Sequence, residues 1–209
     1  MDFFECVLNL GKTTKFLSKE VDDRTIGIIL HAATHAPSAG EIKEWHFFVI
    51  KDKETKDKLV EAALMQKFIS LAPVVITVAV DIEKVTLKYF ERGERLYAIQ
   101  DGGHACMLII LTAHALGLGS YLIRAFDEEK VRRILEMPDH MRPLALITIG
   151  YPAESPEPVK SIPFENITWV DRYGKRFEGK VEDVIASLEK MFKKKEKKEE
   201  VLPKLEEEF

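Results

Sequence analysis

The chain has 209 residues, of which 46% are hydrophobic and 32% are charged, and this composition is typical of a water-soluble globular protein of one domain. Lys and Arg total 31 against 35 Asp and Glu, so the formal net charge is −4. The chain therefore lacks the excess of positive charge that is typical of nucleic-acid-binding proteins. The two cysteines, Cys6 and Cys106, are too few for a disulfide framework and belong to no metal or redox motif.

The first residues do not read as a targeting signal, because Asp2 and Glu5 stand where a basic leader is expected. The longest apolar runs, residues 72–80 and 106–111, are too short to span a bilayer. We therefore expect a cytoplasmic protein with no membrane attachment. Gln and Asn occur only twice each among many Lys and Glu residues, which is typical of a protein from a thermophile.

Hydrophobic periodicity and capping residues predict five helices, over residues 2–10, 22–36, 53–63, 95–116 and 127–135. Runs rich in β-branched residues predict strands over residues 45–50, 73–80, 121–123 and 144–150. Pro37 and Gly40 break the second helix, and the prolines between residues 152 and 163 indicate an irregular passage. Helices and strands mix without strict alternation, so the predicted fold class is α+β rather than a doubly wound sheet.

The chain is predicted to hold one domain over residues 1–178 and a charged helical extension over residues 179–209. Six apolar residues of the extension form one stripe at helical spacing: Val181, Val184, Ile185, Leu188, Met191 and Phe192. The run Lys193–Lys198 beyond it is most simply a solvated helix end.

Two glycine motifs fail as nucleotide sites. Gly11-Lys12-Thr13 imitates the end of a phosphate-binding loop, but Cys6 stands where that pattern needs its first glycine. Gly117-Leu118-Gly119 begins like a dinucleotide fingerprint, but its third glycine is replaced by Leu122. Neither segment predicts a nucleotide-binding loop of those types.

The sequence offers no protein nucleophile or metal centre. His31 and His35 lie four residues apart on a helix, but Ala32 occupies the place of the glutamate that a zinc protease needs. No Gly-x-Ser-x-Gly motif is present, and neither cysteine has a nearby histidine to activate it. We expect no catalytic side chain and no bound metal.

Four separated segments together resemble the nitroreductase family. Residues 11–17 are similar to the family's N-terminal Arg-Arg-Ser-x-Arg-x-Phe, and residues 36–47 to its Ala-Pro-Ser-Ser-x-Asn-x-Gln-Pro-Trp-x-Phe. Residues 101–127 contain Ala-Leu-Gly-Leu-Gly, and residues 147–152 read Ile-Thr-Ile-Gly-Tyr-Pro before Lys160-Ser161-Ile162-Pro163. In order and spacing the resemblance covers roughly residues 5–178.

The resemblance implies a three-layer α+β fold, with a central mixed sheet flanked by helices, in an intertwined homodimer. It also implies FMN at the subunit interface. Hydride from NADH or NADPH would pass through the flavin to a small acceptor by a ping-pong mechanism. Nitroaromatics, quinones, free flavin and oxygen are all acceptors that suit such a site. The chemistry would belong to the flavin, and the protein would supply position and electrostatics.

Carried over residue by residue, the resemblance assigns parts of the flavin to particular side chains. Cationic and hydroxyl groups suit a phosphate, and a cation near the N1–O2 edge stabilises the reduced ring. The implied contacts are Lys12 and Thr13 with the phosphate and ribityl chain; Lys15 with the N1–O2 edge; Pro37, Ser38, Ala39 and Glu41 of the partner subunit with the ring; Ile123, Arg124 and Ala125 with N5 and the ring edge; Gln66 and Lys67 near the ring; and Lys160 and Ser161 with the phosphate.

Several positions depart from the family pattern. Gly11 replaces an arginine, Glu41 replaces an asparagine, Lys43 and Glu44 replace glutamine and proline, and Ala125 replaces a glycine. The missing arginine and the added carboxylates weaken the expected hold on FMN. Two alternatives therefore stay open: a non-catalytic dimer that has lost FMN and binds another ligand or a protein, and an unrelated α+β protein.

Overall fold

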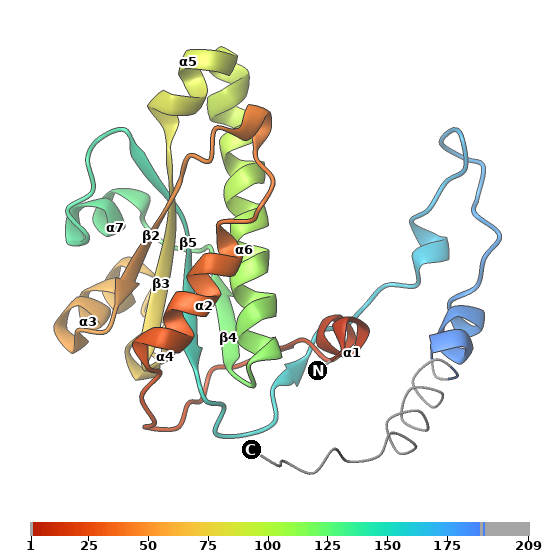
Figure 1. Cartoon of the computed structure of the whole chain (residues 1–209), viewed down its shortest axis with the longest axis horizontal. Helices are drawn as coiled ribbons and strands as arrows, with labels where there is room; N and C mark the ends of the chain where they lie inside the picture. The colour runs from red at the N-terminus through yellow and green to blue at the C-terminus, as the bar shows by residue number, and fades with distance from the viewer. Residues whose placement is uncertain (1, 189, 191–209) are drawn as a thin grey trace, which may run out of the picture. The chain divides into compact units, whose positions relative to one another are not determined.

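The computed structural model describes residues 2–188 and residue 190 (Figure 1). The chain divides into two compact units, with the boundary between Val159 and Lys160. The first unit contains the sheet, its helices and most of the predicted site. The second unit contains the remaining described residues.

The sheet has six strands in the order β2-β3-β5-β4-β1-β6. They are β1 (Gly11–Lys12), β2 (Trp45–Ile50), β3 (Val74–Asp81), β4 (Gly119–Ile123), β5 (Met141–Gly150) and β6 (Glu157–Pro158). Only the β1–β4 pair is parallel, so the sheet is mixed, as predicted. Every residue of β3 is buried, as expected for a central strand covered on both faces.

The helices α2 (Asp23–Ala33) and α6 (Ala98–Ala115) cover one face of the sheet (Figure 1). Asp22 caps α2 by accepting a hydrogen bond from the Thr25 amide at 2.9 Å. Ile29 and Ile109 are fully buried between these helices and the alternate residues of β3 and β5 that face them. Burial of this apolar surface holds the two layers together.

The helices α3 (Lys53–Ala62), α4 (Phe68–Leu71) and α7 (Glu128–Ile134) cover the opposite face. Leu59 and Val131 pack with Val75 and Leu146, which alternate with the residues that point toward α6. Asp127 caps α7, as predicted, by accepting a hydrogen bond from the Lys130 amide at 3.0 Å. The three-layer α+β fold expected from the sequence is confirmed.

The predicted first residue of one helix was wrong. The helix expected over residues 95–116 begins at Ala98, because a π-helical turn, η2 (Gly93–Tyr97), precedes it. A further helix that the sequence did not predict, α5 (Ile82–Arg92), comes before that turn, and Phe90 within it has a positive φ of 51°. The stretch Ile82–Ala115 has the length and hydropathy of a membrane-spanning helix, but α6 buries its inner face against the sheet.

The N-terminal helix α1 (Phe3–Leu8) begins at a capping box formed by Asp2 and Glu5. The second unit contains the short helical turn η3 (Phe164–Asn166), and the ring of Phe164 in this turn contacts the ring of Phe177. Residues 181–188 are helical. The end of the predicted apolar stripe, Met191 and Phe192, and the lysine run beyond it lie outside the described residues.

Candidate functional site

A buried hydroxyl marks the first group of predicted site residues. Thr13 follows β1, its amide donates to the Ser120 carbonyl at 3.0 Å, and its side chain is only 3% exposed. It fits there because Gly119 has no side chain: a Cβ at Gly119 would lie 2.2 Å from Thr13 Oγ1. Thr13 Oγ1 has no hydrogen-bond partner among the described residues. Buried hydroxyls are usually paired, so this oxygen, which packs against Gly119, is an exception among the described residues.

Two lysines line a cavity together with Thr13. Lys12, Thr13 and Lys15 line a cavity of about 130 Å³, together with a second segment that includes Glu154 and Glu157. Lys15 Nζ donates to Glu154 Oε2 at 2.9 Å, and both side chains are mostly exposed. Lys12 forms no ion pair with any other described residue. The structure therefore brings the first three predicted residues together, with Lys15 already partnered.

The predicted groups around residues 66 and 124 also meet. Gln66 Nε2 donates to the Ala125 carbonyl at 3.1 Å and to the Ala63 carbonyl at 2.9 Å. Ile123 is buried at the end of β4, whereas Arg124 and Ala125 emerge from the sheet and are exposed. Lys67 is exposed beside them in sequence. The loop after β4 is thus tied to the loop before α4 by the side chain of Gln66.

The third group lies in the loop after α2, and the N-terminal part of α6 holds it. The Ala39 amide donates to Asp101 Oδ2 at 2.7 Å, and His104 Nδ1 donates to the Pro37 carbonyl at 3.2 Å. Ser38 Oγ accepts from the Lys43 amide at 3.0 Å. The loop enters the left-handed region at Gly40, Glu41 and Lys43, a conformation that non-glycine residues keep only where their surroundings enforce it.

That backbone conformation turns Glu41 and Lys43 outward, and Glu44 inward. Glu41 is mostly exposed and lies 3.7 Å from Lys43. The Glu44 side chain is fully buried, and neither carboxyl oxygen has a hydrogen-bond partner among the described residues. Burial raises the pKa of Glu44 to about 7, and the neighbouring Asp101 carboxyl adds to the rise. Sequence reasoning treated Glu44 only as a departure from a motif and gave Asp101 no role.

The three groups do not form one site within one chain. Thr13 lies against Gly119, just past the C-terminal end of α6, whereas Ala39 is bonded to Asp101 in the first turn of α6 (Figure 1). A helical rise of 1.5 Å per residue puts these two ends roughly 20 Å apart. Gln66, Arg124 and Ala125 lie at the far end of β4 from the Thr13 group. Lys160 and Ser161 belong to the second unit, and both are exposed.

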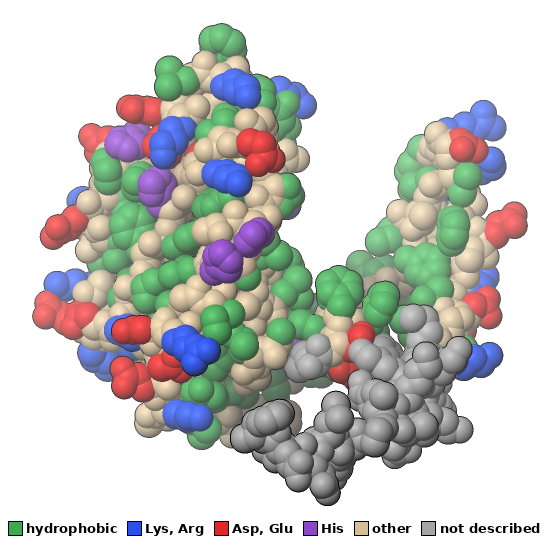
Figure 2. Space-filling view, viewed as in Figure 1, with side chains coloured by type: hydrophobic (Ala, Val, Ile, Leu, Met, Phe, Trp, Pro, Cys, Tyr) green, Lys and Arg blue, Asp and Glu red, His purple; other side chains and the backbone are tan. Residues whose placement is uncertain are grey.

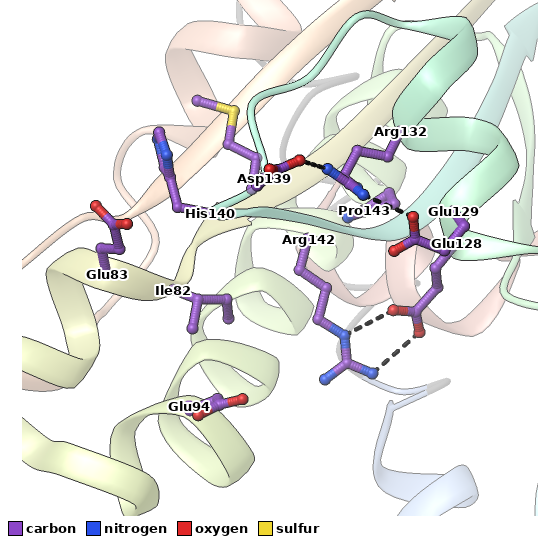
Figure 3. A pocket seen from close by; sticks show the side chains of 11 residues that line it. Ile82, Glu83, Glu94, Glu128, Glu129, Arg132, Asp139, His140, Arg142 and Pro143 are labelled. Carbon is purple, nitrogen blue, oxygen red and sulfur yellow. Dashed lines mark hydrogen bonds and ion pairs between the residues drawn. The ribbon is translucent and has the colours of Figure 1, made fainter.

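A larger cavity of about 410 Å³ lies elsewhere, between the start of α5, α7 and the start of β5 (Figure 3). Its two arginines are already paired. Arg142 donates to both carboxyl oxygens of Glu128, at 2.9 and 3.0 Å, and Arg132 contacts Glu129 and Asp139 (Figure 3). A cavity with its cations neutralised is a poor place for a phosphate.

The molecular surface agrees with the near balance of charge. The face shown in Figure 2 mixes acidic, basic and hydrophobic side chains, without a broad patch of one sign. Among residues 2–188 and 190, no three His, Cys, Asp or Glu side chains lie close enough together to hold a metal ion. The candidate site therefore has three parts: the cavity lined by Lys12, Thr13 and Lys15, which we call the cradle, the loop after β4, and the loop between α2 and β2 that contacts α6.

The mixed sheet lies between two helical layers, and the cavity lined by Lys12, Thr13 and Lys15 lies beside β4. The sequence profile of the nitroreductase family matches residues 13–71 and 64–151 of this chain. The chain belongs to the nitroreductase family. The resemblance proposed from the four segments is thereby confirmed.

Individual relatives agree with that assignment. The NADH dehydrogenase of Thermus thermophilus is 34% identical over 194 residues, which cover 80% of this chain and 95% of the relative. The FMN reductase [NAD(P)H] of Bacillus subtilis is 25% identical over 171 residues, which cover 76% of this chain and 69% of the relative. The crystal structure of a nitroreductase family protein from Streptococcus pneumoniae superposes with a TM-score of 0.75 at 27% identity, covering 81% of this chain and all of that one.

Proposed function

We propose that the protein is an FMN-dependent oxidoreductase that takes hydride from NADH or NADPH and reduces a small acceptor. The observation that carries the proposal is the cavity that Lys12, Thr13 and Lys15 line together, in a chain of the nitroreductase family. When bound, FMN would supply the hydride-transfer chemistry, with the donor and the acceptor reacting in turn at the same site. The name of the Bacillus subtilis relative, an FMN reductase that uses NAD(P)H, supports the choice of this flavin and this class of hydride donor.

The residues of the cradle fit a flavin phosphate. Lys12 supplies a positive charge that forms no ion pair with another described residue, and Thr13 forms part of the wall of the same cavity, where the bond from its amide to Ser120 fixes the backbone. Lys15 reaches the same cavity and would hold the polar edge of the ring. At the other end of β4, the exposed backbone at Arg124 and Ala125 would approach the reactive edge, and Gln66 keeps that backbone in place.

The acceptor would enter beside the loop formed by Pro37, Ser38, Ala39 and Glu41, contributed by a second copy of the chain. Within one chain this loop is roughly 20 Å from the cradle along α6, so both can serve one flavin only across a dimer. An apolar strip on α6 supports such a dimer: Ile99 and Met107 are each 45% exposed, and Gly103 between them leaves open space above the helix. Exposed apolar strips of this kind mark protein interfaces.

The test is a visible absorbance spectrum of the purified protein, recorded before and after addition of FMN and then, anaerobically, of NADH. Bound yellow flavin that bleaches with NADH is the expected result. Sedimentation at the same concentration is expected to give a dimer. A protein that stays colourless and does not change the spectrum of added FMN would refute the proposal.

A second function is favoured by the charges around the cradle. Glu154 and Glu157 line the same cavity and oppose the two lysines, and Gly11 supplies no guanidinium. A dimer that has lost FMN and binds another small molecule or a protein would carry these changes. The colourless outcome of the spectral test would make this non-catalytic scaffold the better account.

A further inference from the structure

Both ends of the loop between α2 and β2 converge on one side chain, Asp101 of α6. The Ala39 amide, near the start of the loop, donates to Asp101 Oδ2 at 2.7 Å. Glu44, the last loop residue before β2, places its carboxyl next to that of Asp101. The Glu44 backbone is fixed from a third side, because its carbonyl accepts from the Asp81 amide at 2.9 Å. Asp101 therefore holds both ends of the loop against α6 only while the Glu44 carboxyl can remain next to its own.

Two buried carboxyls in contact are stable together only when they share a proton, because two negative charges at this distance repel strongly in a poorly hydrated site. Asp101 is the better site for the charge. It accepts a hydrogen bond from the Ala39 amide at 2.7 Å, and such a bond favours the ionised form of a carboxyl. Glu44 is fully buried and accepts no hydrogen bond from the backbone or a donor side chain of another described residue, so it is the better site for the proton.

Charges on the neighbouring elements do not change this assignment. Lys84 of α5 favours the ionised form of Glu44, but it lies 3.5 Å from Asp81 and is half exposed. His104 of α6 lies 3.9 Å from Asp101 Oδ1, beyond hydrogen-bond distance, and uses its Nδ1 proton on the Pro37 carbonyl. The burial of Glu44 and the adjacent Asp101 carboxyl outweigh the effect of Lys84.

We propose that Glu44 and Asp101 hold one proton between them, and that this protonated pair is a latch that keeps the loop of residues 37–44 closed against α6. Loss of the proton puts a second charge into the buried pair, and the loop opens so that Glu44 can reach water. Glu44 is thus a positioning residue, since it acts on the loop through Asp101. The consequence for flavin binding rests on the proposed function, because this loop would line the ring in the partner's site.

The latch predicts a pH dependence that can be measured on the protein without cofactor. If opening returns Glu44 to an ordinary carboxyl pKa, raising the pH from about 6 to about 8.5 weakens loop closure roughly tenfold. The probe is the protection of the Ala39 amide against hydrogen exchange, corrected for the intrinsic effect of pH. In Glu44→Gln, which keeps the shape and removes the titration, protection is expected to stay constant over that range.

Glu41→Gln is the matched control, because it removes a carboxylate from the same loop but from a side chain that is 77% exposed. It is expected to show the wild-type decrease in Ala39 protection. Equal pH dependence in the wild type and in Glu44→Gln would overturn the latch. Should Glu44→Gln fail to fold, the carboxyl carbon resonance of Glu44 in the wild type decides: titration near neutral pH supports the shared proton, and titration near pH 4 overturns it.

A fluorescence titration with FMN at the same pH values separates the two proposals. Flavin affinity that decreases with pH in the wild type and not in Glu44→Gln supports both. Binding that is tight but equally independent of pH in both proteins would overturn the role of the latch at the flavin. Failure to bind FMN at any pH would refute the proposed function, while the exchange of Ala39 would still decide the latch.

Discussion

Substitution of Gly119 by alanine tests the packing of the cradle. The added Cβ would lie 2.2 Å from Thr13 Oγ1 and 2.6 Å from its Cβ and Cγ2, closer than real Cβ atoms come to any neighbour. Thr13 cannot swing away, because it is buried and its amide is bonded to Ser120. Overpacking of this kind lowers the free energy of unfolding by about 1–3 kcal/mol, which lowers the Tm by roughly 2–12 °C in a domain of this size.

Calorimetry at fixed protein concentration measures the effect of Gly119→Ala. The matched control is Gly27→Ala on α2, where an added Cβ meets nothing within 4 Å and the helix gains roughly 0.5–1 kcal/mol. A double variant with Thr13→Gly should recover much of the loss, because it removes the clashing atoms. Gly119→Ala that is as stable as the wild type, or stabilised like Gly27→Ala, would show that Thr13 is not packed as described.

Three further outcomes follow from the structure. Glu44→Gln should flatten the dependence of the free energy of unfolding on pH. Because the pKa of Glu44 is raised to about 7, protonated Glu44 stabilises the folded state fully below the ordinary carboxyl range, and this contribution decreases up to about pH 7, by about 3 kcal/mol in all. Urea titrations of the variant and the wild type at several pH values measure the difference. Lys12→Gln should weaken FMN binding at least several-fold, while Lys58→Gln on the exposed side of α3 should leave it unchanged; equal FMN affinities, measured by fluorescence, would remove Lys12 from the site. Asp127→Ala should lower stability by about 1 kcal/mol through loss of the cap of α7, and an unchanged Tm would contradict that role.

Sequence patterns predicted the elements that carry strong local signals. The strand at residues 45–50 was predicted to the residue, and Asp127 was correctly assigned as a cap, because alternation and capping depend on nearby residues. The strand β1 was not predicted, because two residues that pair with β4 and β6 carry no period. The helix α5 and the π-helical turn at Gly93–Tyr97 were also missed, so the predicted helix began three residues before α6.

The candidate site divides in the same way. Motif resemblance predicted the cradle, the loop after α2 and the loop after β4 as parts of a flavin site, and the structure adds where these segments lie relative to one another. The motif gave no sign that Glu44 is buried. In the sequence this residue stands beside Glu41 and Lys43, and a run of charges predicts a solvated surface. The φ angles are positive at Glu41 and Lys43, the side chains of those two residues are exposed, and that of Glu44 is buried. Glutamate and lysine are not residue types that indicate a positive φ in a sequence.

The length of α6 also predicts the effect of combining two inactivating substitutions, one in each chain of a dimer. In the proposed dimer, each flavin would take its cradle from one chain and its ring-lining loop from the other, because the two lie at opposite ends of that helix. A chain defective in the cradle, paired with a chain defective in the loop, would place both defects in one site and leave the second site whole. Two inactive alleles would then complement each other, recovering up to half of the activity, whereas two alleles with defects in the same group would not.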